Sequence, residues 1–199
     1  MHPRLERRLL LLAGAALLGA ARSPLGVAVE VVGSARAERR EGFRSLAAAV
    51  PLDEGDTLVT DAASRLLARL QGEVELRLGA QSRLRLDALG RSAPGTVLRH
   101  AAGPFWFARP AGAPSAPVAV VSSSLLIAVR GTAFWGGPLD GRFSVFVAHG
   151  LATVTAGNER VEIPAGMGSD IGPDGRPTPA VPWAWDRQAR ALATVGLTP

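Results

Sequence analysis

The densest group of side chains that could do chemistry is Asp53-Glu54-Gly55-Asp56, because its carboxylates are the hard oxygen ligands that Ca²⁺ prefers. The spacing does not follow the EF-hand loop, and acidic residues beside a glycine are common turn formers. Together with Asp61, these carboxylates are also the best candidates for the acid pair of a hydrolase. We interpret the run as a turn and predict no metal site and no cofactor.

The histidines and serines provide no clear catalytic or metal-binding motif. His100 and His149 are the two histidines beyond residue 21, and they are too far apart in sequence to form a local zinc pair. A catalytic triad would need one of them beside Ser122, Ser123 or Ser124, but no Gly-x-Ser-x-Gly motif is present. The chain contains neither Lys nor Cys, which excludes Schiff-base chemistry, thiol catalysis and disulfides. We therefore predict no catalytic residue and expect both histidines at the surface or in turns.

All 22 basic residues are arginine, and the absence of Lys and Tyr helps to raise the sequence pI to about 11.3. Arginines such as Arg69, Arg77 and Arg83 alternate with apolar residues and lie near Glu73 and Glu75. This pattern predicts a solvated sheet face of mixed charge. A nucleic-acid surface would need clustering of positive charge with aromatic residues between, so we expect no nucleic-acid partner.

The clearest periodicity lies between residues 65 and 87, where apolar residues occupy the even positions and charged residues mostly the odd ones. Strict alternation predicts strands with one buried face. At the turn, a three-residue loop from Gln71 to Glu73 places Leu70 opposite Val74 and keeps the apolar face on one side. We expect further strands at 27–32, 57–60, 105–107, 118–121, 125–129, 143–148, 152–156 and 160–163, with a two-residue turn at 157–158.

Alternation in the aromatic strand 105–107 places Phe105 and Phe107 on one face and Trp106 on the other. We expect both faces to be covered. A helical pattern near the end of the chain provides one apolar stripe that we expect to dock on the same domain, formed by Trp185, Ala189, Leu192 and Val195.

Four segments are expected. Residues 1–21 have the basic start, the short apolar run and the small residues of a signal peptide, which predicts a periplasmic or secreted protein without a stable membrane span after cleavage. Residues 22–171 form the β domain, the proline-rich residues 172–182 an extended linker, and residues 183–199 a helical tail.

The run 125–129 is interrupted by Arg130-Gly131-Thr132 and resumes at Ala133-Phe134. A glycine inside a strand usually marks a bulge or a close backbone approach. We interpret Gly131 as structural, permitting close backbone packing between Val129 and Phe134.

Several segments occur in a characteristic order: 52–56, a glycine between alternating strands at position 72, 129–134, and His149-Gly150. In this succession the chain resembles a FecR domain over roughly residues 27–171. The resemblance implies an all-β fold, either a β-roll, a short β-solenoid or a sandwich-like domain, that acts by protein contact without catalytic machinery. It also implies structural signature positions at Gly55, Asp56, Gly72, Gly131, Thr132, Phe134 and Gly150.

Our leading hypothesis is a non-enzymatic binding or sensing module whose partner is an envelope protein or a cell-wall glycan. Transmembrane regulators of the family carry a cytoplasmic helical segment that holds the sigma factor, whereas only eight residues precede the apolar run here. Two alternatives stay open. One is a regulator of sigma-factor signalling of the iron-uptake type, anchored by a retained leader, and the other is an envelope hydrolase that uses carboxylates.

Overall fold

The computed structural model describes residues 24–88, 96–110, 118–123 and 125–199, so the predicted signal peptide lies outside the described residues. Strands dominate the described part of the chain, and one short helix follows them there, as expected for an all-β domain with a C-terminal helix. The elements are β1 (Gly26–Val32), β2 (Ala35–Arg39), β3 (Gly42–Ser45), β4 (Pro51–Leu52), β5 (Thr57–Thr60), β6 (Arg65–Leu70), β7 (Val74–Leu78), β8 (Arg83–Ala88), β9 (Thr96–Ala102), β10 (Phe105–Ala108), β11 (Val118–Val121), β12 (Leu126–Leu139), β13 (Arg142–Ala156), β14 (Glu159–Pro164), β15 (Met167–Asp170), β16 (Val181–Pro182) and α1 (Trp185–Ala193).

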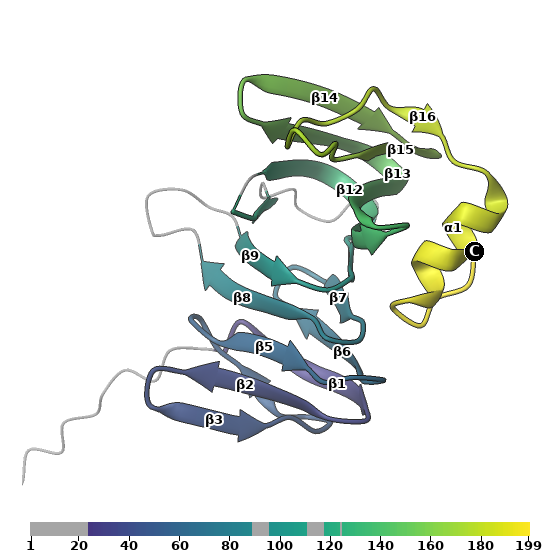
Figure 1. Cartoon of the computed structure of the whole chain (residues 1–199). Coiled ribbons are helices and arrows are strands. Elements are labelled where there is room, and N and C mark those ends of the chain that lie inside the picture. Colours follow the sequence, from purple (N-terminus) through teal and green to yellow (C-terminus); the bar gives the residue numbers. More distant parts are fainter. Residues whose placement is uncertain (1–23, 89–95, 111–117, 124) are drawn as a thin grey trace, which may run out of the picture.

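The strands form one hydrogen-bonded ladder that folds back on itself. Its path runs β3-β2-β5-β8-β9-β11 to β12 and then returns through β10-β7-β6-β1 to β4. We call the outward run the first wall and the returning run the second wall. Figure 1 shows the strands stacked from β3 at the bottom to β14 at the top, where β13 joins the long β12. The apolar core therefore lies between the two walls.

The fold-back occurs inside β12. Its residues 126–129 pair with β11, whereas residues 133–136 pair with β10, and the register shifts between them. Gly131 lies at the shift with φ +58°, and Gly150 lies near it on β13 with φ +81°. A side chain at Gly150 would put its Cβ 2.5 Å from the carbonyl oxygen of Gly131, whereas a Cβ at Gly131 would meet no atom within 4 Å. Gly131 is thus needed for its backbone angle, and the close approach that we expected there occurs at Gly150.

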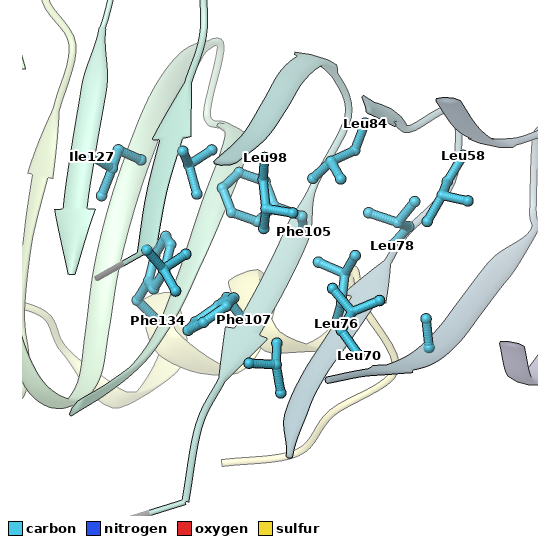
Figure 2. Close-up of a cluster of buried hydrophobic side chains, with 14 of the residues drawn as sticks. Leu58, Leu70, Leu76, Leu78, Leu84, Leu98, Phe105, Phe107, Ile127 and Phe134 are labelled. Carbon is cyan, nitrogen blue, oxygen red and sulfur yellow. The ribbon is translucent and has the colours of Figure 1, made fainter. Parts of the chain in front are cut away.

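The main core confirms the alternation in the sequence. The even-numbered apolar residues of β6, of β7 and of β8 up to Leu86 are buried, and Leu70 pairs with Val74 across the three-residue turn, as predicted. The predicted two-residue turn at 157–158 is also present, because Ala156 pairs with Glu159. Figure 2 shows side chains of both walls, such as Leu84 and Leu76, gathered in one cluster.

A second apolar cluster lies on the outer side of the sheet, under α1. Trp106 belongs to it while Phe105 and Phe107 belong to the main core, so both faces of β10 are covered as expected. The helix and the residues that follow it dock on their own domain, the helix through Leu192 and the following segment through Val195. The predicted stripe was wrong at Trp185, which is 71% exposed, and the buried tryptophan is Trp183. Trp183 precedes the helix and stacks on Phe146 at a ring distance of 5.2 Å.

The proline-rich segment 172–182, which we expected as an extended linker, is fastened to the sheet. The Thr178 amide donates to the Asp170 carbonyl at 2.8 Å, and the Asp170 amide donates to the Thr178 hydroxyl at 3.0 Å. β16 then pairs with β15. These bonds hold the start of α1 at a fixed place on the domain. No helix within the described residues has the length and hydropathy needed to cross a bilayer.

Candidate functional site

The acidic turn at 53–56 is held by two arginines from the β2–β3 hairpin. Asp56 is fully buried, and its Oδ1 accepts hydrogen bonds from Arg39 Nε at 2.5 Å and from Arg44 at 3.1 Å. Its Oδ2 accepts from the Asp53 amide at 2.8 Å and from Arg44. Guanidinium groups therefore take the place that a calcium ion would need.

The pKa of Asp56 follows from these contacts. Burial alone would raise it, but hydrogen bonds from Arg44, from the Asp53 amide and from Arg39 outweigh burial and hold the pKa below its ordinary value. A catalytic general acid needs the opposite shift. Asp56 is thus an ionised structural anchor at the lower end of the first wall.

Other carboxylates of the first wall are paired in the same way. Glu38 lies between Arg36, at 2.9 Å, and Arg83, and Asp87 lies between Arg85, at 2.8 Å, and Arg99. This network is the face of mixed charge that we predicted. Asp61 accepts from Arg36 Nη1 at 2.7 Å. Within the described residues, no group of three or more His, Asp or Glu side chains could hold a metal ion.

The two histidines differ. His149 is exposed on β13, as expected, but His100 is buried, and our expectation of a surface position was wrong there. The His100 ring lies 4.9 Å from the ring of Phe105 and 5.4 Å from that of Phe143, with Nε2 2.7 Å from the Gly103 carbonyl oxygen. Burial lowers the pKa of His100. His100 is therefore a core residue. Of the three serines considered as members of a catalytic triad, Ser124 lies outside the described residues.

The signature positions lie at turns, at the fold-back and in the core. Gly55 and Gly72 occupy turns with positive φ, and the Gly55 amide donates to the Leu86 carbonyl at 2.7 Å. Thr132 is buried beside the fold-back, where its hydroxyl donates to the Leu151 carbonyl at 2.9 Å. The remaining positions are Asp56 in the acidic turn, Gly131 and Gly150 at the fold-back, and Phe134 in the main core.

A groove of about 580 Å³ opens on the outer side of the second wall, next to the residues that follow α1. Its floor includes a cross-strand row in which Ala108 of β10 pairs with Glu75 of β7, and Glu75 pairs with Arg69 of β6. The groove is lined by Arg69, Glu73, Glu75, Trp106, Ala108, Arg109, Pro110 and Leu197.

The groove combines apolar surface with charge of both signs. Glu75 is half-buried, and its Oε1 accepts from Arg77 Nε at 2.7 Å. Arg69 and Glu73 are exposed and form no ion pair with another described residue. Arg109 is only 8% exposed, and burial lowers its pKa. The arrangement can hold a small ligand that presents both a cation and an anion.

Another open cleft, of about 400 Å³, lies at the lower end of the first wall. Its lining includes Glu38, Arg39 and Arg83, which already form ion pairs with neighbours. A ligand there would have to compete with these pairs. The lining of this cleft is charged apart from Gly55 and Thr57, whereas the groove beside Leu197 also offers apolar surface. The groove is therefore the better candidate site.

Sequence reasoning missed this groove. The charged residues of β6 and β7 were interpreted as a solvated face, and Trp106 was expected to be covered. The charged face is solvated and Trp106 is covered in part, yet the groove forms only where β10 and the segment after α1 meet β6 and β7. The alternating charges next to a turn glycine were the one local signal.

Comparison with known proteins agrees with the fold. Residues 56–153 match the family model described as FecR protein, so the chain contains a FecR domain over these residues. The family resemblance in the sequence is thereby confirmed. No curated protein matches the chain closely enough to count as a relative.

Two crystal structures of a candidate anti-sigma factor from Parabacteroides distasonis ATCC 8503 share the fold. Their TM-scores are 0.58 and 0.57, with sequence identities of 14% and 13%. Each match covers 70% of this chain, and 65% and 64% of the other chains, so the match spans just under two thirds of their length.

Proposed function

We propose that this chain is a non-enzymatic FecR-domain protein, periplasmic or secreted, that binds another component of the cell envelope, either a protein or a cell-wall glycan. The observation that carries the proposal is the groove beside Leu197, where Trp106 lies near Arg69 and Glu73, two exposed side chains that form no ion pair with another described residue. Binding residues that project from paired strands keep their geometry before a ligand arrives, which lowers the entropic cost of binding.

The state of the carboxylates supports a role without catalysis. Of the four carboxylates that an envelope hydrolase would use, Asp53, Asp56 and Asp61 accept hydrogen bonds from arginine, and Glu54 is exposed on the turn. For Asp56 and Asp61 the pKa is lowered, which favours the ionised form and disfavours a proton donor. The hydrolase alternative therefore loses its best candidates.

The test is capture from an envelope extract. Immobilised protein is compared with a variant in which the groove is filled by Ala108→Leu, and with Arg160→Gln on the exposed face of β14 as a control. We expect a specific protein or glycan that the original chain and the control retain and the filled variant loses. Capture of no specific component, or equal capture by all three, would contradict the proposal.

A second candidate role is regulation of a sigma factor. It is favoured by one observation, the fold shared with the candidate anti-sigma factor from Parabacteroides distasonis. This role requires that the leader is retained as an anchor. N-terminal sequencing of the protein from its native cells tests it, because a mature chain that begins at Arg22 would remove the anchor and with it this alternative.

A further inference from the structure

We infer that the groove beside Leu197 binds a short peptide with free ends, of the size of a dipeptide, and with small apolar side chains. This inference rests on the proposed function for the position of the binding site, and it names a free short peptide as the occupant of the groove in place of a protein or a glycan. In it, Glu73 and Glu75 take the ammonium group of the peptide, and Arg69 takes the carboxylate.

The charges of the groove are available for this purpose. Glu75 uses one carboxylate oxygen for Arg77, and Glu73 projects from the turn after β6. Arg69 lies on the neighbouring strand, directly opposite Glu75 in the register, yet the two side chains do not form an ion pair. A guanidinium that is not paired with a protein carboxylate can bind a ligand carboxylate with two parallel hydrogen bonds.

The spacing fits a dipeptide. Neighbouring strands lie about 4.8 Å apart, which sets the distance between the backbones that carry Glu75 and Arg69. Two residues of an extended chain span about 6.6 Å, so the free ends of a dipeptide reach both groups when these long side chains lean apart. A single amino acid brings its charges closer together, and a longer peptide carries them beyond this pair.

The rest of the lining favours small apolar side chains. Beyond Glu75 the row continues to Ala108, and Pro110 and Leu197 complete the apolar part. Trp106 is only 9% exposed, because it packs into the second apolar cluster. The volume of about 580 Å³ lies within the usual range of small-ligand pockets, about 300 to 1,000 Å³, so we favour a small ligand over a protein surface as the occupant of the groove.

The experiment is a calorimetric titration of the full chain with L-Ala-L-Ala and D-Ala-D-Ala. We expect saturable binding of at least one of them, and no binding of alanine that is acetylated at its amino end and amidated at its carboxyl end. Arg69→Gln and Glu75→Gln each weaken binding about tenfold or more, because each removes a charge-assisted hydrogen bond. Ala108→Leu abolishes binding by filling the groove without changing the charge.

The matched controls are Arg160→Gln and Glu162→Gln, which make the same chemical changes on the exposed β14 and leave binding unchanged. Absence of binding by both dipeptides overturns the inference, as does equal binding of the blocked alanine or binding that survives both Arg69→Gln and Ala108→Leu. Thermal unfolding of each variant shows whether it is folded. If the dipeptides fail while an envelope component is captured in the groove-dependent way described above, the inference fails alone. Failure of both experiments rejects the proposed function as well.

Discussion

The acidic turn at 53–56 and the groove beside Leu197 both bring arginines and carboxylates together, but they leave these groups in different states. At the turn, the carboxylate of Asp56 is buried and two guanidinium groups surround it. At the groove, Arg69 and Glu75 lie opposite each other on the neighbouring strands β6 and β7, and their side chains do not form an ion pair. The same residue types thus fasten the lower end of the sheet in one region and leave charges for a ligand in the other.

Burial explains the difference. Asp56 lies where the β2–β3 hairpin folds over the turn, so an unpaired charge there would cost several kcal/mol. Arg69 lies on an open face, where water solvates it and an ion pair would add little. Removal of charge is therefore expected to reduce stability at the turn and binding at the groove.

The largest effect is expected for Asp56→Asn. Removing this buried anion leaves Arg39 and Arg44 without their main partner, and we expect the free energy of unfolding at pH 7 to fall by about 3 kcal/mol. Urea titration measures it. The control is Asp174→Asn in an exposed pair with Arg176, for which the change stays within about 0.5 kcal/mol. Equal effects of the two substitutions would show that Asp56 is not a buried anchor.

The pH dependence of stability provides a second test of Asp56 as a buried, ionised anchor. Because the pKa of Asp56 is lowered in the fold, its stabilisation is present above the ordinary value of 3.8 and is lost as the pH falls through the lowered value. The original chain should therefore lose stability steeply in acid, and Asp56→Asn should flatten this loss. Identical acid profiles of the two proteins would contradict the assignment.

The next largest effect is expected for Gly150→Ala, which should lower the free energy of unfolding, measured by urea titration, by about 2 kcal/mol. The substitution adds the cost of a positive φ and pushes a Cβ against the Gly131 carbonyl oxygen, 2.5 Å away. At Gly157, which also has positive φ but open space around it, alanine should cost about 1 kcal/mol. If Gly157→Ala destabilises as much as Gly150→Ala, the close approach at the fold-back has no energetic weight.

A smaller effect on the pH dependence of stability is expected from His100. Burial lowers its pKa below 6.5, so the fold favours the neutral ring, and stability is lost as the pH falls from 6.5 through the lowered value. His100→Gln keeps a donor for the Gly103 carbonyl and removes the titrating ring. The variant should show a flatter stability profile in this range in chemical denaturation, and an unchanged slope would exclude His100 as its source.

The smallest effect on stability is expected at the groove. Arg69→Gln should change the free energy of unfolding by less than about 0.5 kcal/mol, since the side chain is exposed and forms no ion pair with another described residue. Urea titration beside Arg160→Gln measures this. A loss as large as that of Asp56→Asn would place Arg69 among the structural arginines and remove it from the binding site.

The features that could be predicted from the sequence are those set by near neighbours. The period of two and the parity of the turn fix Leu70 opposite Val74, and the alternation around Trp106 separates the two clusters. The burial of His100 could not be predicted, because Phe143 covers it from a distant strand. The helical pattern predicted burial of Trp185, whereas the buried tryptophan is Trp183. The pattern could not show this, because Trp183 precedes the helix and is buried by stacking on Phe146.

The candidate groove depends still more on distant contacts. Its row joins Arg69, Glu75 and Ala108 through the pairing of β7 with β10, which are separated by two further strands in the chain. Leu197 closes it from the far end of the sequence. Local periodicity carries no information on such pairings, so each residue looked like part of an ordinary solvated face.

The most direct test of the contrast between the two regions is a map of amide chemical shifts of the full chain while L-Ala-L-Ala is added and, in a second titration, D-Ala-D-Ala, with shifts expected from at least one of the two dipeptides. We expect shifts to change at the turn between β6 and β7, along β10 and at Leu197, while the amides of residues 53–56 stay unchanged. Changes centred on residues 53–56, or no changes at all, would contradict the account.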